Sequence, residues 1–171
     1  LYDGPEQREA LARLSRVRID YLAPESQPGA VAPKALLLAG WLASRLGWRI
    51  VSEPAQTNES AQLFSFEQDG RAITVELAAC EHESVAPGGI ARVELVAESE
   101  PRRSFVAMHA EHGRDLKMQQ ATGAEDAQTT RVVTFADKSP AELLVAELEI
   151  LSHDRLYEDA VFKVAEMLGS K

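Results

Sequence analysis

The stretch that decides the fold is "LLLAGWLASRLGW", residues 36–48, which has the pattern of a helix but is apolar on almost every side. A helix on the surface of a small domain normally carries one apolar stripe and one polar face. Here only Lys34 and Arg45 form a narrow charged edge. We therefore expect the helix, residues 34–46, to pack on a sheet on one side. On the other side we expect the terminal helices, a further part of the protein, or a partner. Burial of both sides within the domain is the favoured arrangement, with Trp41 in the core.

The middle of the chain has the pattern of β-structure. Asp69 and Gly70 separate two runs in which apolar and polar residues alternate, which is a strong signal for a hairpin. Residues 53–60 have the composition of a loop. The predicted hairpin covers residues 62–80, and the other predicted strands are residues 17–23, 49–52, 90–99, 103–113, 114–122 and 131–137.

The two ends of the chain have the pattern of helices. Residues 5–14 begin with a proline, and residues 140–151 follow a capping-box sequence that starts at Ser139. A last helix spans residues 155–168, with a predicted apolar stripe of Leu156, Ala160, Val164 and Leu168. The order of elements predicts an α+β fold, with a largely antiparallel sheet in the middle of the chain and helices at the N- and C-terminal ends packing on it.

Composition restricts the class of protein. A chain of 171 residues, 45% of them apolar, is long enough for a single domain with a substantial core. A net charge of −9 argues against nucleic acid or an anionic membrane as a partner. One cysteine allows no internal disulfide, so a reduced cytoplasmic protein is expected. The chain begins at Leu1 rather than Met, and we expect it to be the C-terminal part of a longer protein.

Histidine and cysteine give only weak candidates for chemistry. His109 and His112 point to opposite faces of a strand, so they do not bind one metal ion together. In an extended chain, Glu81 and Glu83 likewise lie on the face opposite to His82. Cys80 lies, by alternation, on the face opposite to Ile73, Val75 and Leu77, and its acidic neighbours favour a neutral thiol. We therefore expect no metal site, no cofactor and no catalytic residue.

Two segments resemble a known family. Residues 36–48 and "AELLVAELEILSHDRLYEDAV", residues 141–161, are similar to the OpcA family, the glucose-6-phosphate dehydrogenase assembly proteins of cyanobacteria and actinobacteria. The order of an apolar, Trp-containing helix, a β-rich middle and a Leu/Glu-rich C-terminal segment is also similar. The resemblance covers nearly all of the chain, as the C-terminal portion of a longer protein.

The resemblance implies a non-enzymatic protein that binds glucose-6-phosphate dehydrogenase and favours its active oligomer, which supports NADPH production in the oxidative pentose phosphate pathway. Thioredoxin-dependent control through cysteines, known in cyanobacterial members, cannot operate as a dithiol switch in a chain that has only Cys80. The candidate partner contacts are Trp41 and the acidic edge of the terminal helices, represented by Glu147, Glu149 and Glu158.

Two other functions remain open from the sequence. A regulatory domain that binds a sugar phosphate would need a basic pocket, for which the candidate residues are Arg92, Arg102, Arg103 and Arg114. An enzyme would have to use Cys80 or the histidines at 109 and 112. A deep pocket with convergent polar groups would favour either of these, and a flat or apolar surface would favour the assembly protein.

Overall fold

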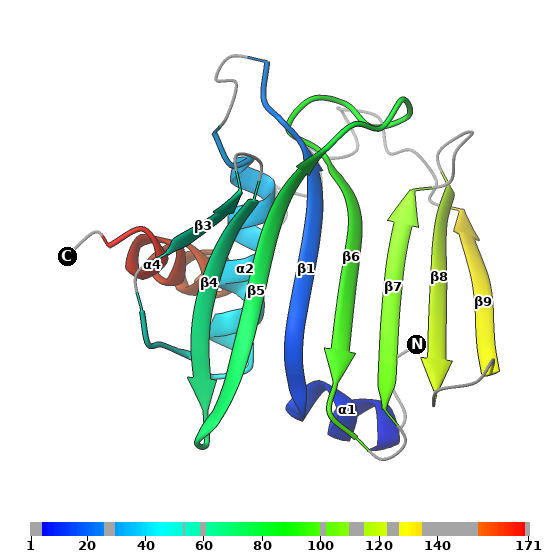
Figure 1. Ribbon diagram of the computed structural model, residues 1–171, viewed down its shortest axis with the longest axis horizontal. Helices are drawn as coiled ribbons and strands as arrows, with labels where there is room; N and C mark the ends of the chain where they lie inside the picture. The colour runs from blue at the N-terminus through cyan, green and yellow to red at the C-terminus, as the bar shows by residue number, and fades with distance from the viewer. Residues whose placement is uncertain are drawn as a thin grey trace.

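One large β-sheet organises the molecule. A computed structural model describes residues 5–25, 30–52, 54–58, 61–99, 102–109, 115–122, 127–134 and 154–169. The sheet has nine strands in the order β2-β4-β5-β1-β6-β7-β8-β9, with β3 paired to β4 (Figure 1). The strands are β1 (Leu14–Leu22), β2 (Arg49–Ile50), β3 (Ala55–Asn58), β4 (Ala61–Gln68), β5 (Arg71–Cys80), β6 (Ile90–Ala97), β7 (Arg103–His109), β8 (Asp115–Thr122) and β9 (Ala127–Thr134).

The sheet is largely antiparallel, as predicted, but its centre is parallel. β1 pairs with β5 in parallel register, with Val17 opposite Val75, and every other strand pair among the described residues is antiparallel. The predicted hairpin joins β4 to β5. Asp69 and Gly70 both have positive φ, the conformation that a two-residue turn needs to match the twist of the strands.

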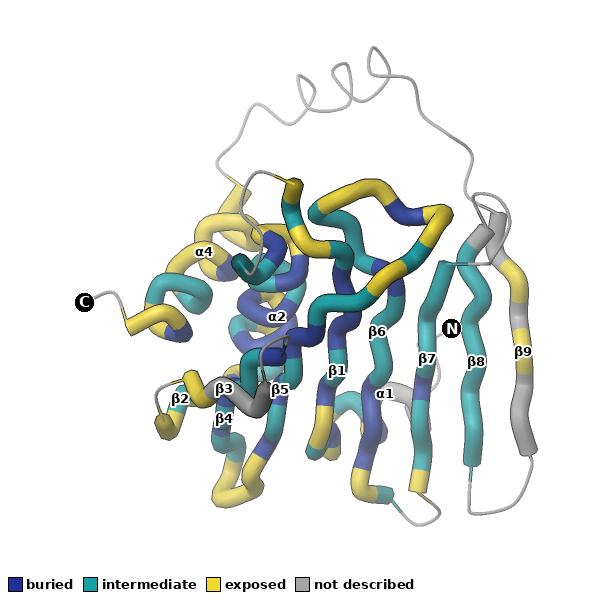
Figure 2. The backbone as a smooth tube through the Cα atoms, turned by 45° about the horizontal axis from the view of Figure 1, so that its top comes forward, coloured by how far each residue is buried: buried dark blue, intermediate teal, exposed yellow. Residues whose placement is uncertain are grey.

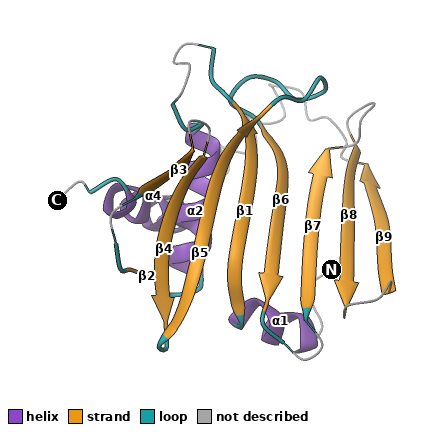
Figure 3. Ribbon diagram, viewed as in Figure 1, coloured by secondary structure: helices purple, strands orange, loops and turns teal. Residues whose placement is uncertain are grey.

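Two of the helices, α2 (Pro33–Arg45) and α4 (Arg155–Met167), form further layers on one face of the sheet, and α1 (Pro5–Ala12) lies at one end of its strands (Figure 3). α1 leads into β1, and α2 lies against β1 and β5. α4 packs mainly on the outer side of α2. Of the terminal helices, α1 contributes Ala10 to the core, whereas α4 covers the internal helix α2, which itself lies on the sheet.

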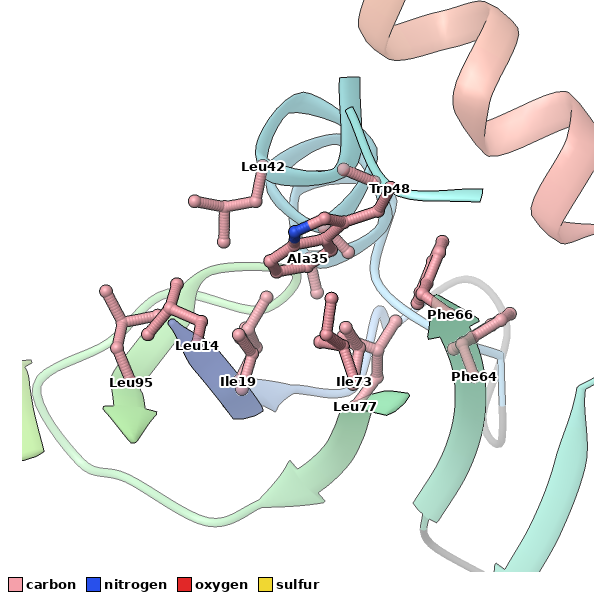
Figure 4. Close-up of a cluster of buried hydrophobic side chains, with 14 of the residues drawn as sticks. Leu14, Ile19, Ala35, Leu42, Trp48, Phe64, Phe66, Ile73, Leu77 and Leu95 are labelled. Carbon is pink, nitrogen blue, oxygen red and sulfur yellow. The ribbon is translucent and has the colours of Figure 1, made fainter. Parts of the chain in front are cut away.

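The core lies between α2 and the middle of the sheet. Alternate residues of the central strands point inward, among them Val17, Ile19, Val75 and Leu77. Figure 4 shows Trp48 lying among these side chains under α2. The dark-blue segments of Figure 2 follow the same elements, α2, β1 and β5.

The end of α2 directs Trp48 into the core. Gly47 has a φ of +68°, and the Trp48 N–H donates to the carbonyl of Ala43 at 2.8 Å, which is the Schellman pattern for ending a helix. Trp48 is 1% exposed, and its ring lies 5.7 Å from that of Phe66 between centroids. Trp41 is 43% exposed, so the prediction that it belongs to the core is wrong.

Several boundaries also differ from the prediction. The predicted loop at 53–60 contains β3, which pairs with the beginning of β4, and β9 starts earlier than residue 131. On α4, Leu156 and Leu168 of the predicted stripe are exposed, whereas Ala160 and Met167 are buried. The predicted helix at 140–151 lies outside the described residues.

Candidate interaction surface

α4 is a well-defined helix from its first turn. The Asp154 carboxylate accepts hydrogen bonds from the backbone N–H groups of Leu156 and Tyr157, at 3.0 and 3.2 Å. These bonds satisfy donors that the start of a helix otherwise leaves without an intrahelical partner. Ala160 and Met167 are buried on the side that faces α2. The local sequence therefore fixes both where the helix begins and which side it buries.

Gly40 allows α4 to lie close to α2. A Cβ atom at this position would stand 2.6 Å from the carbonyl oxygen of Ala160 and 2.7 Å from a methyl carbon of Val164. Only glycine fits so short a distance without a displacement of the neighbouring helix. The apolar pattern of α2 is thus explained: one side contacts the sheet and another contacts α4, as the sequence predicted for the terminal helices.

The helical layer carries several large apolar side chains in contact with solvent. Phe162 is 70% exposed, and it is one of several large apolar side chains that this layer exposes, a feature that favours an interaction site more than a single exposed residue would. We use the name "α4 surface" for this region. It comprises Leu156, Tyr157, Val161 and Phe162 of α4, Leu168 directly after α4, and Trp41 of α2.

Acidic residues accompany the apolar ones on α4. Glu158, Asp159 and Glu166 are exposed, and Glu166 forms an ion pair with Lys163 at 2.7 Å. Of the acidic contacts predicted from the sequence, Glu158 therefore lies on α4 beside the α4 surface. Glu147 and Glu149 fall outside the described residues.

Trp41 lies on the charged edge of α2, the side that also carries Lys34 and Arg45. It follows Lys34 by seven residues and precedes Arg45 by four, and these spacings bring all three to one side of a helix. All three are exposed. The helical spacing was the signal that could have placed Trp41 outside the core.

Cys80 is at the end of β5 on the face opposite the core, as its parity predicted. Burial raises the pKa of its thiol above the ordinary value, the Asp20 carboxylate raises this pKa further, and the Arg18 guanidinium opposes the change. Arg18 itself is held by Asp20 at 2.8 Å and by Glu76 at 3.1 Å. A thiol in this setting stays protonated at neutral pH and is a poor nucleophile.

His82 and His109 lie close together, a pairing that the sequence did not predict. The ring of His109 lies 6.5 Å from that of His82 between centroids. His112, its predicted neighbour in the chain, falls outside the described residues. His82 Nδ1 accepts a hydrogen bond from the N–H of Ser84 at 3.3 Å. In the described part of the chain, no three His, Cys, Asp or Glu side chains are grouped as metal ligands would be.

The arginines proposed for a basic pocket do not gather together. Arg92 pairs with Glu94 at 3.1 Å on β6, and Arg103 is the first residue of β7. Arg102 lines a hollow with Arg13, a residue that sequence reasoning did not select. Arg114 is outside the described residues. Of the three predicted arginines that the structure describes, Arg102 is the one that lines this hollow.

Comparison with known proteins identifies the family. The family model OpcA_G6PD_C, which describes the C-terminal domain of the glucose-6-phosphate dehydrogenase subunit, matches residues 1–161. The chain belongs to this family. The resemblance to OpcA proteins that the sequence indicated is confirmed.

Curated relatives carry the name "Putative OxPP cycle protein OpcA". The one from Synechococcus elongatus is 28% identical over 174 residues, which cover 99% of this chain and 38% of the relative. The one from Nostoc punctiforme is 29% identical and covers 96% of this chain and 36% of the relative. The chain thus corresponds to well under half the length of these relatives.

A likeness to solved structures is weaker. A dehydrogenase from Clostridium difficile aligns with a TM-score of 0.47 at 9% identity, over 96% of this chain and 58% of that chain. Similarity at this level carries no argument about activity. None of the described helices is long and apolar enough to cross a membrane.

Proposed function

We propose that this domain is a non-enzymatic partner of glucose-6-phosphate dehydrogenase, which it binds through the α4 surface and holds in its active oligomer. The observation that carries the proposal is the exposed apolar and aromatic side of the helical layer in a member of the OpcA family. The names of the curated relatives support a place in the oxidative pentose phosphate pathway.

The composition of the α4 surface suits a protein partner. Trp and Tyr are enriched among the residues that dominate binding energy at interfaces, and Trp41, Tyr157 and Phe162 provide three aromatic side chains on this layer. Glu158 and Asp159 add negative charge around them. We therefore expect the dehydrogenase to present an apolar recess that has basic residues at its rim.

The settings of Cys80 and the histidines support a non-enzymatic role. The Cys80 thiol has a raised pKa, and the His82 and His109 rings are not part of a group of three or more His, Cys, Asp or Glu side chains among the described residues. A partner protein needs no such group, because its effect on the dehydrogenase comes from binding one oligomeric state more tightly than another.

The direct test is binding and activation of the cognate dehydrogenase by the double variant Phe162→Ala, Leu168→Ala. Both side chains are exposed, so the fold should survive, while binding weakens by about 2 kcal/mol or more if they are central to the interface. Titration calorimetry measures the affinity, and initial rates of NADP⁺ reduction measure the activation.

The matched control is Val51→Ala, Val132→Ala, which truncates two exposed apolar side chains outside the helical layer. This control should bind and activate as the wild type does. Unchanged binding by the Phe162 and Leu168 variant, or an equal loss in the control, would refute the assignment of the α4 surface.

A further inference from the structure

Two adjoining hollows lie at one end of the strands of the sheet, away from the α4 surface. Their volumes are about 620 and 410 Å³, and both are lined by Arg13 and Glu98. Arg102 and Ser99 line the first, and Arg71 and Ser15 line the second. We call the two hollows together the arginine groove.

The sheet topology explains why three arginines distant in sequence share this groove. β1, β5 and β7 run in the same direction, because β1 is parallel to β5 and both β1 and β7 are antiparallel to β6. The first residues of all three strands therefore lie at the same end of the sheet. Arg13 directly precedes β1, Arg71 is the first residue of β5, and Arg102 directly precedes β7.

Backbone contacts hold the walls of the groove in place. The Arg71 guanidinium donates to the carbonyl of Ala12 at 2.7 Å, and the N–H of Glu98 donates to the carbonyl of Arg13 at 3.0 Å. Arg13 also contacts Glu9 at 3.0 Å. A guanidinium carries five N–H donors in a fixed plane, so one such bond leaves further donors for a ligand. Two of the three arginines, Arg71 and Arg13, are thus held by contacts within the chain.

The charges of the groove select a class of ligand. Three guanidinium groups in a chain of net charge −9 favour an anion, and arginine pairs well with the oxygens of phosphate. The Glu98 carboxylate would repel a bare anion, but it can accept hydrogen bonds from hydroxyl groups. A ligand that has a phosphate at one end and hydroxyls at the other satisfies both.

We propose that the arginine groove binds a phosphate monoester of a polyhydroxy compound, such as a sugar phosphate. Arg13 and Arg102, which line the same hollow, bind the phosphate, Arg71 adds positive charge from the adjoining hollow, and Glu98 accepts hydrogen bonds from the hydroxyl groups. This inference goes beyond the proposed partner role and does not depend on it, because the groove and the α4 surface share no residues.

The test is isothermal titration of the 171-residue chain with glucose 6-phosphate, inorganic phosphate and glucose. Glucose 6-phosphate should bind saturably and more tightly than inorganic phosphate, and glucose alone should not bind measurably. Arg13→Ala, Arg102→Ala should weaken binding of glucose 6-phosphate roughly tenfold or more, since each removes charge-assisted hydrogen bonds. The matched control, Lys34→Ala, Arg155→Ala, removes the same charge from α2 and α4 and should bind like the wild type.

A second variant separates the role of Glu98 from simple charge. Glu98→Gln keeps the size of the side chain but removes its negative charge, so inorganic phosphate should bind more tightly while glucose 6-phosphate loses its advantage. Absence of saturable binding of glucose 6-phosphate, an equal loss in the Lys34 and Arg155 control, or equal affinity of the wild type for phosphate and glucose 6-phosphate would each overturn the proposal. Thermal unfolding of every variant shows whether a loss of binding reflects a loss of fold.

Discussion

The two tryptophans of this chain have opposite environments although only seven positions separate them. Trp48 lies just beyond the end of α2 and is almost completely enclosed between that helix and the sheet, beside Phe66. Trp41 lies on α2 itself, yet it reaches solvent along the edge that Lys34 and Arg45 share. The inner side of the helical layer thus has the properties of a core, and the outer side has those of an interface.

The difference shows that tryptophan has two roles in this part of the molecule: Trp48 fills the core, and Trp41 is exposed as part of the α4 surface. On the inner side, the small residues Ala35, Ala39 and Ala43 let α2 approach the sheet closely, and the large Trp48 fills the space at the end of the helix. On the outer side, α4 covers α2 and leaves its own aromatic residues uncovered. Stability should therefore depend on the inner side, and partner binding on the outer side.

The strongest way to break this comparison is to truncate each tryptophan separately. Trp48→Ala should lower the free energy of unfolding by about 3–5 kcal/mol, because it leaves a large cavity in the core. Trp41→Ala should cost only about 1 kcal/mol, since much of the ring is already in contact with water. Urea unfolding followed by circular dichroism measures both. Equal losses in the two variants would mean that the two sides of the layer do not differ as described.

Gly40→Ala tests the contact between the two helices. The added methyl group would stand 2.6 Å from the carbonyl oxygen of Ala160, so α4 must shift, at a cost of about 1–3 kcal/mol. Thermal unfolding gives the loss, and hydrogen exchange of the α4 amides shows whether it is local to that helix. Ser44→Ala on the same helix is the control and should change stability by no more than about 0.5 kcal/mol.

Local patterns in the sequence were sufficient for most strands and for the three described helices. The turn at Asp69 and Gly70 fixed the β4–β5 hairpin, and Gly47 fixed the end of α2, because each position requires a backbone conformation that few residues adopt. Strand β3 was missed because Ala55 and the polar residues that follow it have no apolar alternation, and only pairing with β4 makes them a strand.

Long-range arrangement was beyond the sequence. The parallel pairing of β1 with β5 and the placement of Arg13, Arg71 and Arg102 around two adjoining hollows depend on which strands become neighbours, which no local pattern specifies. The exposure of Trp41 is a different case. Its spacing from Lys34 and Arg45 indicated the outer edge, whereas its apolar character favoured the core, and the spacing proved the better guide.

A smaller effect is expected from the cap of α4. Asp154→Ala removes the acceptor for the N–H groups of Leu156 and Tyr157, at a cost of about 1 kcal/mol. Asp154→Asn keeps an acceptor oxygen in the same place and should be nearly neutral. Hydrogen exchange at the amides of Leu156 and Tyr157 should accelerate in the alanine variant only. Faster exchange in both variants would show that charge rather than capping matters at this position.

The smallest effect concerns the acidic residues beside the α4 surface. Glu158→Lys, Asp159→Lys reverses two exposed charges, and charges at the rim of an interface mainly change the rate of association. If the dehydrogenase presents basic groups there, association should slow severalfold at low salt, and the difference should vanish at about 1 M salt, where screening acts within roughly 3 Å. Stopped-flow or surface-plasmon measurements at two salt concentrations give the rates.

Glu81→Lys, Glu83→Lys, in the loop after β5, reverses the same charge elsewhere and separates a local effect from that of net charge. Should both variants slow association equally, net charge alone steers the two proteins together, and the outer side of the helical layer would then contribute through its apolar side chains only.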